Sequence, residues 1–194
     1  MALVPRLRGT DAAQQRGGTT DVAAHDAYLL GRAQWHSRDV PELRRAVDNF
    51  HAAIARDSGF ALAWSGLADA IDALAFRDTS ALGLMPEGRR AAVHALALAP
   101  DLAEAWASVG VIATEYDRDW AAGELALRRA VELQPSYAHA YHQLGGVLRN
   151  SGRIEEARPF LERAVELDPL SALMREGLGN ELRIQADTVE ARVQ

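Results

Sequence analysis

Two histidines, His139 and His142, have a spacing at which two side chains can share a metal ion. Three residues apart on a helix, both imidazoles lie on one face and could ligate zinc or nickel. A third ligand is not evident nearby, and two histidines alone seldom hold a metal. Cysteine is absent, which excludes a thiolate site. We therefore expect this chain to bind no metal and no cofactor.

Side chains for catalysis are equally scarce. All 21 basic residues are arginine, so the chain lacks a Schiff-base amine and a Walker-type phosphate lysine as well as a cysteine nucleophile. The helix dipole explains Glu155 and Glu156 near a helix start, and solvent exposure explains Glu162 with Glu166. Catalytic carboxylates need a cleft that shifts their pKa, and no pattern in the sequence predicts one. We expect a protein that is not an enzyme.

Composition and charge limit the partners. Apolar residues make up 48% of the 194 residues and charged residues 25%, which is ordinary for a globular protein with a substantial core. The net charge of −6 argues against direct binding of nucleic acid, which needs a basic stripe. No apolar run reaches the roughly 18 residues of a membrane span, and the first residues lack a secretory signal. The expected location is the cytoplasm, without membrane contact, and the all-arginine, alanine-rich usage suggests a bacterial genome.

The elements that position these side chains follow from residues 138–171. Large side chains at Tyr141, Leu144 and Leu148 recur every three or four residues and define one face of a helix. A turn follows, and a second amphipathic helix runs until Pro169, because proline cannot continue the hydrogen-bond ladder. The segment is a helical hairpin, and two short helices cannot bury their apolar faces alone.

The hairpin recurs at intervals of 34 residues. We expect a leader or linker over residues 1–20 and a repeat array over residues 21–194. Residues 75–85 lengthen the second repeat, as a longer loop or a helix extension, and the chain stops inside what should be the second helix of the fifth. The recurring positions are Leu144, Gly145, Leu148 and Ala157, which reappear as Leu178, Gly179, Leu182 and Ala191. The approximate repeats are 21–59, 60–101, 102–136, 137–170 and an incomplete 171–194.

The period and the residue pattern resemble the tetratricopeptide repeat (TPR). In the fourth repeat the matching residues are Tyr141, Leu144, Gly145, Ala157, Leu161, Ala164 and Pro169. Small residues at Gly145 and Ala157 let two helices approach closely, while bulky residues fill the space between hairpins. The resemblance implies an all-α fold, an α-α superhelix of stacked hairpins whose concave side binds proteins or peptides.

Four further segments resemble the repeat arrays of bacterial multidomain signalling proteins. They are residues 28–32, 53–57, 60–69 and 117–120. In that group a similar array follows a winged-helix DNA-binding head, a nucleotide cyclase or a Ser/Thr kinase. The resemblance implies a sensory or protein-binding module of a larger regulator, and it leaves the identity of the head open.

In the TPR family the first helix of each hairpin lines the concave surface, so its non-packing residues are candidates for a peptide-binding groove. Arg149 and Arg183 occupy equivalent places and, with Asn150 and Asn180, could hold a carboxylate or a backbone amide of an extended peptide. The alternative is a solvated polar face. The candidates in the fourth and fifth repeats are His139, His142, Gln143, Arg149, Asn150, Glu176, Asn180 and Arg183. In the second and third repeats the corresponding surface offers Leu62, Ser65, Asp69, Asp72, Glu104 and Glu115.

Three hypotheses for function follow from these features. The first is a non-catalytic scaffold that binds a peptide or a partner domain in the concave groove. The second is self-assembly, in which the unfinished C-terminal repeat docks on another copy. The third is the regulatory segment of a cyclase or kinase whose catalytic part lies outside this chain. Some family members grip the C-terminal carboxylate of chaperones with Lys and Asn, and the absence of lysine argues against that ligand here.

Overall fold

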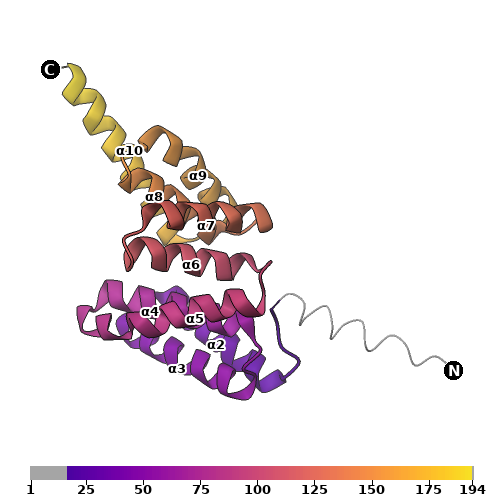
Figure 1. Ribbon diagram of the computed structural model, residues 1–194. Coiled ribbons are helices and arrows are strands. Elements are labelled where there is room, and N and C mark those ends of the chain that lie inside the picture. Colours follow the sequence, from indigo (N-terminus) through magenta and orange to yellow (C-terminus); the bar gives the residue numbers. More distant parts are fainter. Residues whose placement is uncertain (1–16, 194) are drawn as a thin grey trace.

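The computed structural model describes residues 17–193, with side chains described up to residue 183. Within this range the backbone is helical and contains no strand, which confirms the all-α prediction. Antiparallel helix pairs follow one another along the array (Figure 1). The pairs are α2 (Val22–Ser37) with α3 (Val40–Arg56), α4 (Ala61–Arg77) with α5 (Met85–Leu98), α6 (Ala103–Glu115) with α7 (Trp120–Leu133), and α8 (Ala138–Asn150) with α9 (Ile154–Leu167), and then comes α10 (Ala172–Val193).

The helix ends are set by local hydrogen bonds. The Asp21 carboxylate accepts from the Ala24 amide at 2.8 Å and caps α2, as its place before the first periodic residues indicates. Asp119 caps α7 in the same way, through the Ala122 amide at 3.0 Å. Pro41 lies in the first turn of α3, where its missing N–H costs nothing.

Close helix contacts hold each hairpin together. A Cβ atom added to Gly145 on α8 would lie 2.6 Å from Leu161 Cγ on α9, so only glycine fits there. Leu144, Leu148 and Leu161 are buried around this contact. Each hairpin then packs on the next through its second helix and the following first helix, which builds the superhelix.

The lengthened second repeat contains a helix extension, one of the two expected alternatives, followed by a short 3₁₀ helix. Helix α4 runs on to Arg77, beyond the length of α6 or α8, and a 3₁₀ helix, η1 (Thr79–Leu84), follows it. Asp78 starts η1 because its carboxylate accepts from the Ser80 amide at 3.0 Å. The segment packs onto the array, since Ala81 and Met85 are buried.

The C-terminal segment differs from the expected start of a fifth hairpin. Residues 172–193 form one continuous helix, α10, without a turn. The stretch from Arg183 to Glu190 contains neither glycine nor proline, so nothing interrupts the helix. Ala191, expected in a second helix, lies outside the residues whose side chains are described.

The expected leader falls mostly outside the described residues, which begin at Gly17. The described part, residues 17–20, is hydrogen-bonded to the array: the Gly17 carbonyl accepts from the Leu62 amide of α4 at 2.9 Å. The Thr19 hydroxyl donates to the Asp57 carboxylate at 2.5 Å. Residues 17–20 are therefore held against the first two helix pairs.

Candidate peptide-binding channel

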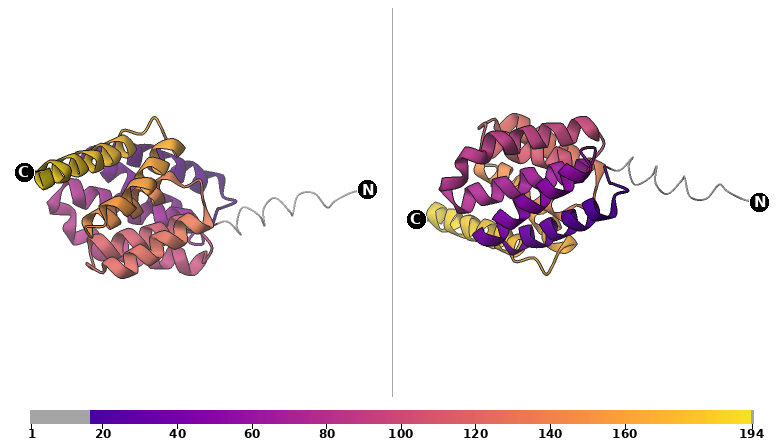
Figure 2. Two further views of the ribbon diagram at one scale, coloured as in Figure 1. Left: turned by 90° about the horizontal axis from the view of Figure 1, so that it is seen from above. Right: turned by 90° about the horizontal axis from the view of Figure 1, so that it is seen from below.

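The superhelix brings the first repeat against the fourth. The Trp35 indole on α2 packs edge-on against the His139 imidazole on α8, with ring centroids 5.1 Å apart. Trp35 is buried and its Nε1–H donates to the Asp69 carbonyl on α4 at 3.1 Å. Two views along the array show α2 and α10 on the same side of the molecule (Figure 2). Side chains of repeats that are not neighbours thus meet across the inner face.

Three adjoining cavities follow this inner face. The first has a volume of about 530 Å³ and lies between the C-terminal ends of α2 and α4 and the starts of α8 and α10. The second, about 200 Å³, shares Arg38 and His139 with the first. The third, about 90 Å³, shares His142 and Gln143 with the second and ends at Asn150. We call this row of three cavities the inner channel.

Six of the eight candidate groove residues line the inner channel. His139 and Glu176 line the first cavity, and His139 also lines the second. The others are His142 and Gln143 in the second and third cavities, with Arg149 and Asn150 in the third. Asn180 and Arg183 line none of the three cavities. The two arginines paired by sequence period are therefore not brought together at one site.

Several channel residues escaped the sequence reasoning. Arg32, Trp35 and Arg38 come from the end of α2, and Arg77 ends α4 within the lengthened second repeat. The period of the array says which residues are equivalent in neighbouring repeats. The period gives no information about contacts between the first repeat and the fourth. Among these residues, only Arg77 lies in a segment that the sequence marks as unusual, the insertion at residues 75–85.

A buried polar group lies behind the channel. The Ser108 hydroxyl on α6 donates to Asp69 Oδ1 at 2.6 Å, and Asp69 Oδ2 has no hydrogen-bond partner among the described residues. Burial raises the pKa of Asp69 to about 6, although the Ser108 hydrogen bond acts in the opposite direction. Asp69 and Ser65 were expected on an accessible surface, and that expectation is wrong because α2 and α6 pack on this part of α4.

The titratable side chains of the channel have shifted pKa values. Burial raises the pKa of Asp72 to about 7, and Glu115 adds to the shift. Burial lowers the pKa of His142 to about 4, with the Arg149 charge acting in the same direction. Burial, aided by Arg38, lowers the pKa of His139 well below its usual range. Both imidazoles are therefore neutral at pH 7, and the fixed positive charge of the channel comes from arginine.

A metal site would need a third ligand beside His139 and His142. Among the residues that the structure describes, no group of three or more His, Asp or Glu side chains is arranged to hold a metal ion.

Within the same range, no helix has the length and apolar character needed to cross a membrane.

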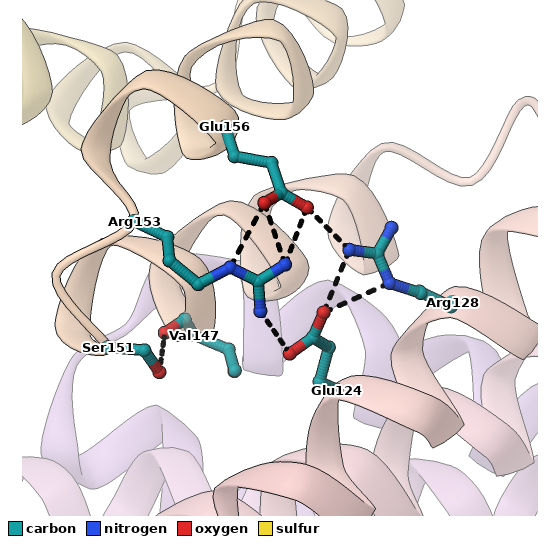
Figure 3. A network of polar contacts seen from close by, with 6 residues as sticks. All are labelled: Glu124, Arg128, Val147, Ser151, Arg153 and Glu156. Atoms are coloured by element: carbon teal, nitrogen blue, oxygen red, sulfur yellow. Dashed lines mark hydrogen bonds and ion pairs between the residues drawn. The ribbon is translucent and has the colours of Figure 1, made fainter.

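The outer face contrasts with the channel, because its charges neutralise one another. Figure 3 shows Arg128 and Arg153 bridging two carboxylates between α7 and α9. Arg128 Nη2 lies 2.8 Å from oxygens of both Glu124 and Glu156. Arg153 Nη1 lies 2.6 Å from Glu124, and Arg153 Nη2 lies 2.6 Å from Glu156. Two positive and two negative charges are satisfied within the protein, which leaves little for a ligand.

A family comparison identifies the repeat unit. Residues 138–169 match the family described as Tetratricopeptide repeat. This match confirms the repeat type inferred from the hairpin at residues 138–171.

Two curated proteins align with part of the chain. The protein O-mannosyl-transferase Tmtc1 of Drosophila melanogaster is 37% identical over 100 residues, which are 50% of this chain and 10% of that protein. The protein O-mannosyl-transferase TMTC1 of Homo sapiens is 37% identical over 65 residues, which are 34% of this chain and 7% of that protein. The aligned region thus spans a tenth or less of these relatives.

Solved structures share the superhelix. TTC0263, a thermophilic TPR protein of Thermus thermophilus, superposes with a TM-score of 0.67 at 19% identity, over 84% of this chain and 83% of that one. The first TPR of Spaghetti (RPAP3), bound to an HSP90 peptide, gives a TM-score of 0.53 at 22% identity, over 67% and 96%. MamA gives 0.52 at 20% identity, over 87% and 86%. These similarities confirm the fold as a TPR superhelix.

Proposed function

We propose that this chain, an array of tetratricopeptide repeats, is a non-catalytic interaction module that holds an extended peptide or partner segment in the inner channel. The observation that carries the proposal is the row of three adjoining cavities, which is lined by α2, α4, α6, α8 and α10. TPR arrays are in general scaffolds for protein interactions. The channel gives such a scaffold a defined place for its partner.

The lining of the channel suits a peptide. An extended backbone presents a donor and an acceptor at every residue, and the side chains of Gln143, Arg149 and Asn150 offer both kinds of partner. The exposed Phe76 ring and Leu173 line the second cavity and supply apolar contact. The solved Spaghetti TPR domain binds an HSP90 peptide, which supports peptide binding by a related fold. Chaperone-tail recognition by lysine is not available to this chain.

The module is proposed to act within a larger bacterial regulatory protein in the cytoplasm. The segments that resemble bacterial signalling arrays support this context, and so does the arginine-only basic composition. The curated relatives are O-mannosyl-transferases, and the aligned region is a small part of each. A regulatory segment of an enzyme, such as a cyclase or kinase, is therefore the alternative from a different class.

Self-assembly is a second candidate, favoured by the C-terminal helix. Leu182 on α10 is 45% exposed and Leu170 before it is still more open to solvent, so this end of the array has apolar surface to cover. Light scattering during size exclusion at two protein concentrations measures the mass directly. A mass that rises with concentration favours self-assembly, and a constant monomer mass favours the interaction module.

A channel-blocking variant tests the proposed function. Gly146 lines the third cavity and no atom lies within 4 Å of an added Cβ, so Gly146→Trp should fold and fill the channel. Gly83 in η1 is equally open but lies outside the channel, which makes Gly83→Trp the matched control. Peptides selected from a random display library on the unaltered protein should bind Gly146→Trp at least about tenfold more weakly. Equal binding to both variants would contradict the channel as the site.

A further inference from the structure

Three arginines gather at the first cavity without ion-pair partners. Arg32, Arg38 and Arg77 all line it, and none forms an ion pair with any residue that the structure describes. Other arginines of the array do form ion pairs, as Arg44 does with Asp78 at 2.6 Å. The first cavity is therefore a place where positive charge is left for another molecule.

The indole of Trp35 holds two of these side chains in place. The Arg38 guanidinium carbon lies 3.9 Å from the centroid of the Trp35 ring, and that of Arg32 lies 4.8 Å away. Stacking on an aromatic face uses the flat side of a guanidinium and leaves its N–H edge available. Because Trp35 is buried and anchored to α4, the two arginines have a fixed support.

Neighbouring charges shift the pKa of Arg38 in both directions. Burial lowers its pKa, Asp69 and Asp72 oppose that shift, and Arg32 and Arg77 add to it. The three guanidinium groups thus repel one another across the cavity. Two carboxylates, Asp168 and Glu176, line the same cavity, and neither forms an ion pair with any described residue. An anion between the arginines would relieve this repulsion.

A buried imidazole at the same cavity also lacks a partner. His139 is 8% exposed, and its Nδ1 atom has no hydrogen-bond partner among the described residues. A neutral imidazole can donate from one nitrogen, so this group adds a neutral donor beside the guanidinium edges. Leu173 and Met174 of α10 supply apolar wall next to these donors.

We propose that the first cavity binds the carboxylate of a glutamate within the partner peptide, held by Arg38 and Arg77, with its methylene stem against Leu173. This assignment rests on the proposed function, because the peptide continues from here into the second and third cavities. The site exists only because the superhelix closes the first repeat onto α8 and α10. The cavity accepts a side chain of this length together with its neighbouring backbone.

Isothermal titration with synthetic peptides tests the assignment. The probe is hexaglutamate with a blocked N-terminus and an amidated C-terminus, and hexaglutamine with the same ends is its uncharged match. We expect hexaglutamate to bind at least about tenfold more tightly. Arg38→Gln/Arg77→Gln should reduce its affinity to that of hexaglutamine, whereas Arg90→Gln/Arg129→Gln, with the same loss of charge on exposed residues, should not. Arg77→Gln alone removes an exposed side chain at a helix end, so it tests the site even if the double variant unfolds.

Several outcomes would overturn the assignment. Equal binding of the two peptides, or an equal loss in both double variants, would show that no specific glutamate site exists. Tight binding only of hexaglutamate with a free C-terminus would assign a terminal carboxylate instead. Full displacement by inorganic phosphate at a matching charge concentration would show unspecific anion binding. If Gly146→Trp abolishes binding of selected peptides while the arginine variants do not, the channel remains the site and the glutamate assignment fails.

Discussion

Helices α8 and α10 carry leucine, glycine and leucine at the same spacing, at positions 144, 145 and 148 and at positions 178, 179 and 182, in different surroundings. Leu148 on α8 is 0% exposed, whereas its equivalent on α10, Leu182, is 45% exposed. An added Cβ at Gly145 would meet Leu161 at 2.6 Å, while at Gly179 it would meet no atom within 4 Å. The difference arises from α9, the second helix of the fourth repeat, which places Leu161 against Gly145 of α8 and not against Gly179 of α10.

The structural role of a repeat residue therefore depends on what packs against it, and not on its residue type alone. Glycine at the Leu-Gly position is needed where a second helix of the same hairpin lies against it. On α10, whose partner helix is absent from the described residues, the same glycine only weakens the helix, since glycine costs about 1 kcal/mol relative to alanine in a helix.

Replacement of the two equivalent glycines should give the largest contrast. Gly145→Leu places a side chain into Leu161 and should lower the free energy of unfolding by about 3 kcal/mol or more, or prevent folding. Gly179→Leu should leave it unchanged or raise it by about 0.5 kcal/mol, because it improves helix propensity in open space. Urea unfolding followed by circular dichroism measures both. Similar losses in the two variants would mean that α10 packs as tightly as α8.

The two equivalent arginines should differ in binding by a smaller amount. Arg149 lines the third cavity and Arg183 does not, so Arg149→Glu should weaken binding of library-selected channel peptides about tenfold and Arg183→Glu should have little effect. Helicity should stay the same in both variants, since both side chains lie outside the core. Fluorescence anisotropy with labelled peptides separates them. An equal loss in both would restore the groove inferred from the sequence period alone.

The smallest effect concerns a carboxylate on α10. Glu181 occupies the place of Val147, is fully buried, and has neither carboxylate oxygen bonded to a described residue. Burial raises its pKa above the ordinary 4.5, so folding favours the protonated form, and its stabilisation is present below pH 4.5 and lost as pH rises through the folded pKa. Glu181→Gln removes the charge, and the exposed Glu155→Gln is its control.

We expect Glu181→Gln to raise the free energy of unfolding by about 0.5 to 1 kcal/mol at pH 8 and to change it little at pH 4. Thermal unfolding across this pH range gives the measurement. A benefit at pH 4 that disappears at pH 8 would have the opposite sign and would contradict the burial of Glu181.

The hairpins and their glycine contacts could be predicted because they depend on residues within one repeat. Tyr141, Leu144 and Gly145 mark the packing face of the first helix and the place where the second helix comes close. The single helix at residues 172–193 was missed because the period was extended past a stretch without a helix breaker. Periodicity shows which residues are equivalent in successive repeats, but it does not show whether the second helix of a hairpin forms.

The channel was predicted only in part, for a different reason. Small rotations between hairpins accumulate along a superhelix, so the contact between Trp35 and His139 depends on all intervening repeats. Asp69 is covered by α2 and α6 of the neighbouring repeats, and this burial raises its pKa. Neither follows from a residue spacing.

The edge-on packing of Trp35 against His139 also has a mechanical consequence. An open solenoid can change its pitch to fit the length of a bound partner, but two rings in contact across its centre oppose such a change. Stretching this array would first have to separate the two rings, so force on its ends should meet an initial resistance before the coil lengthens.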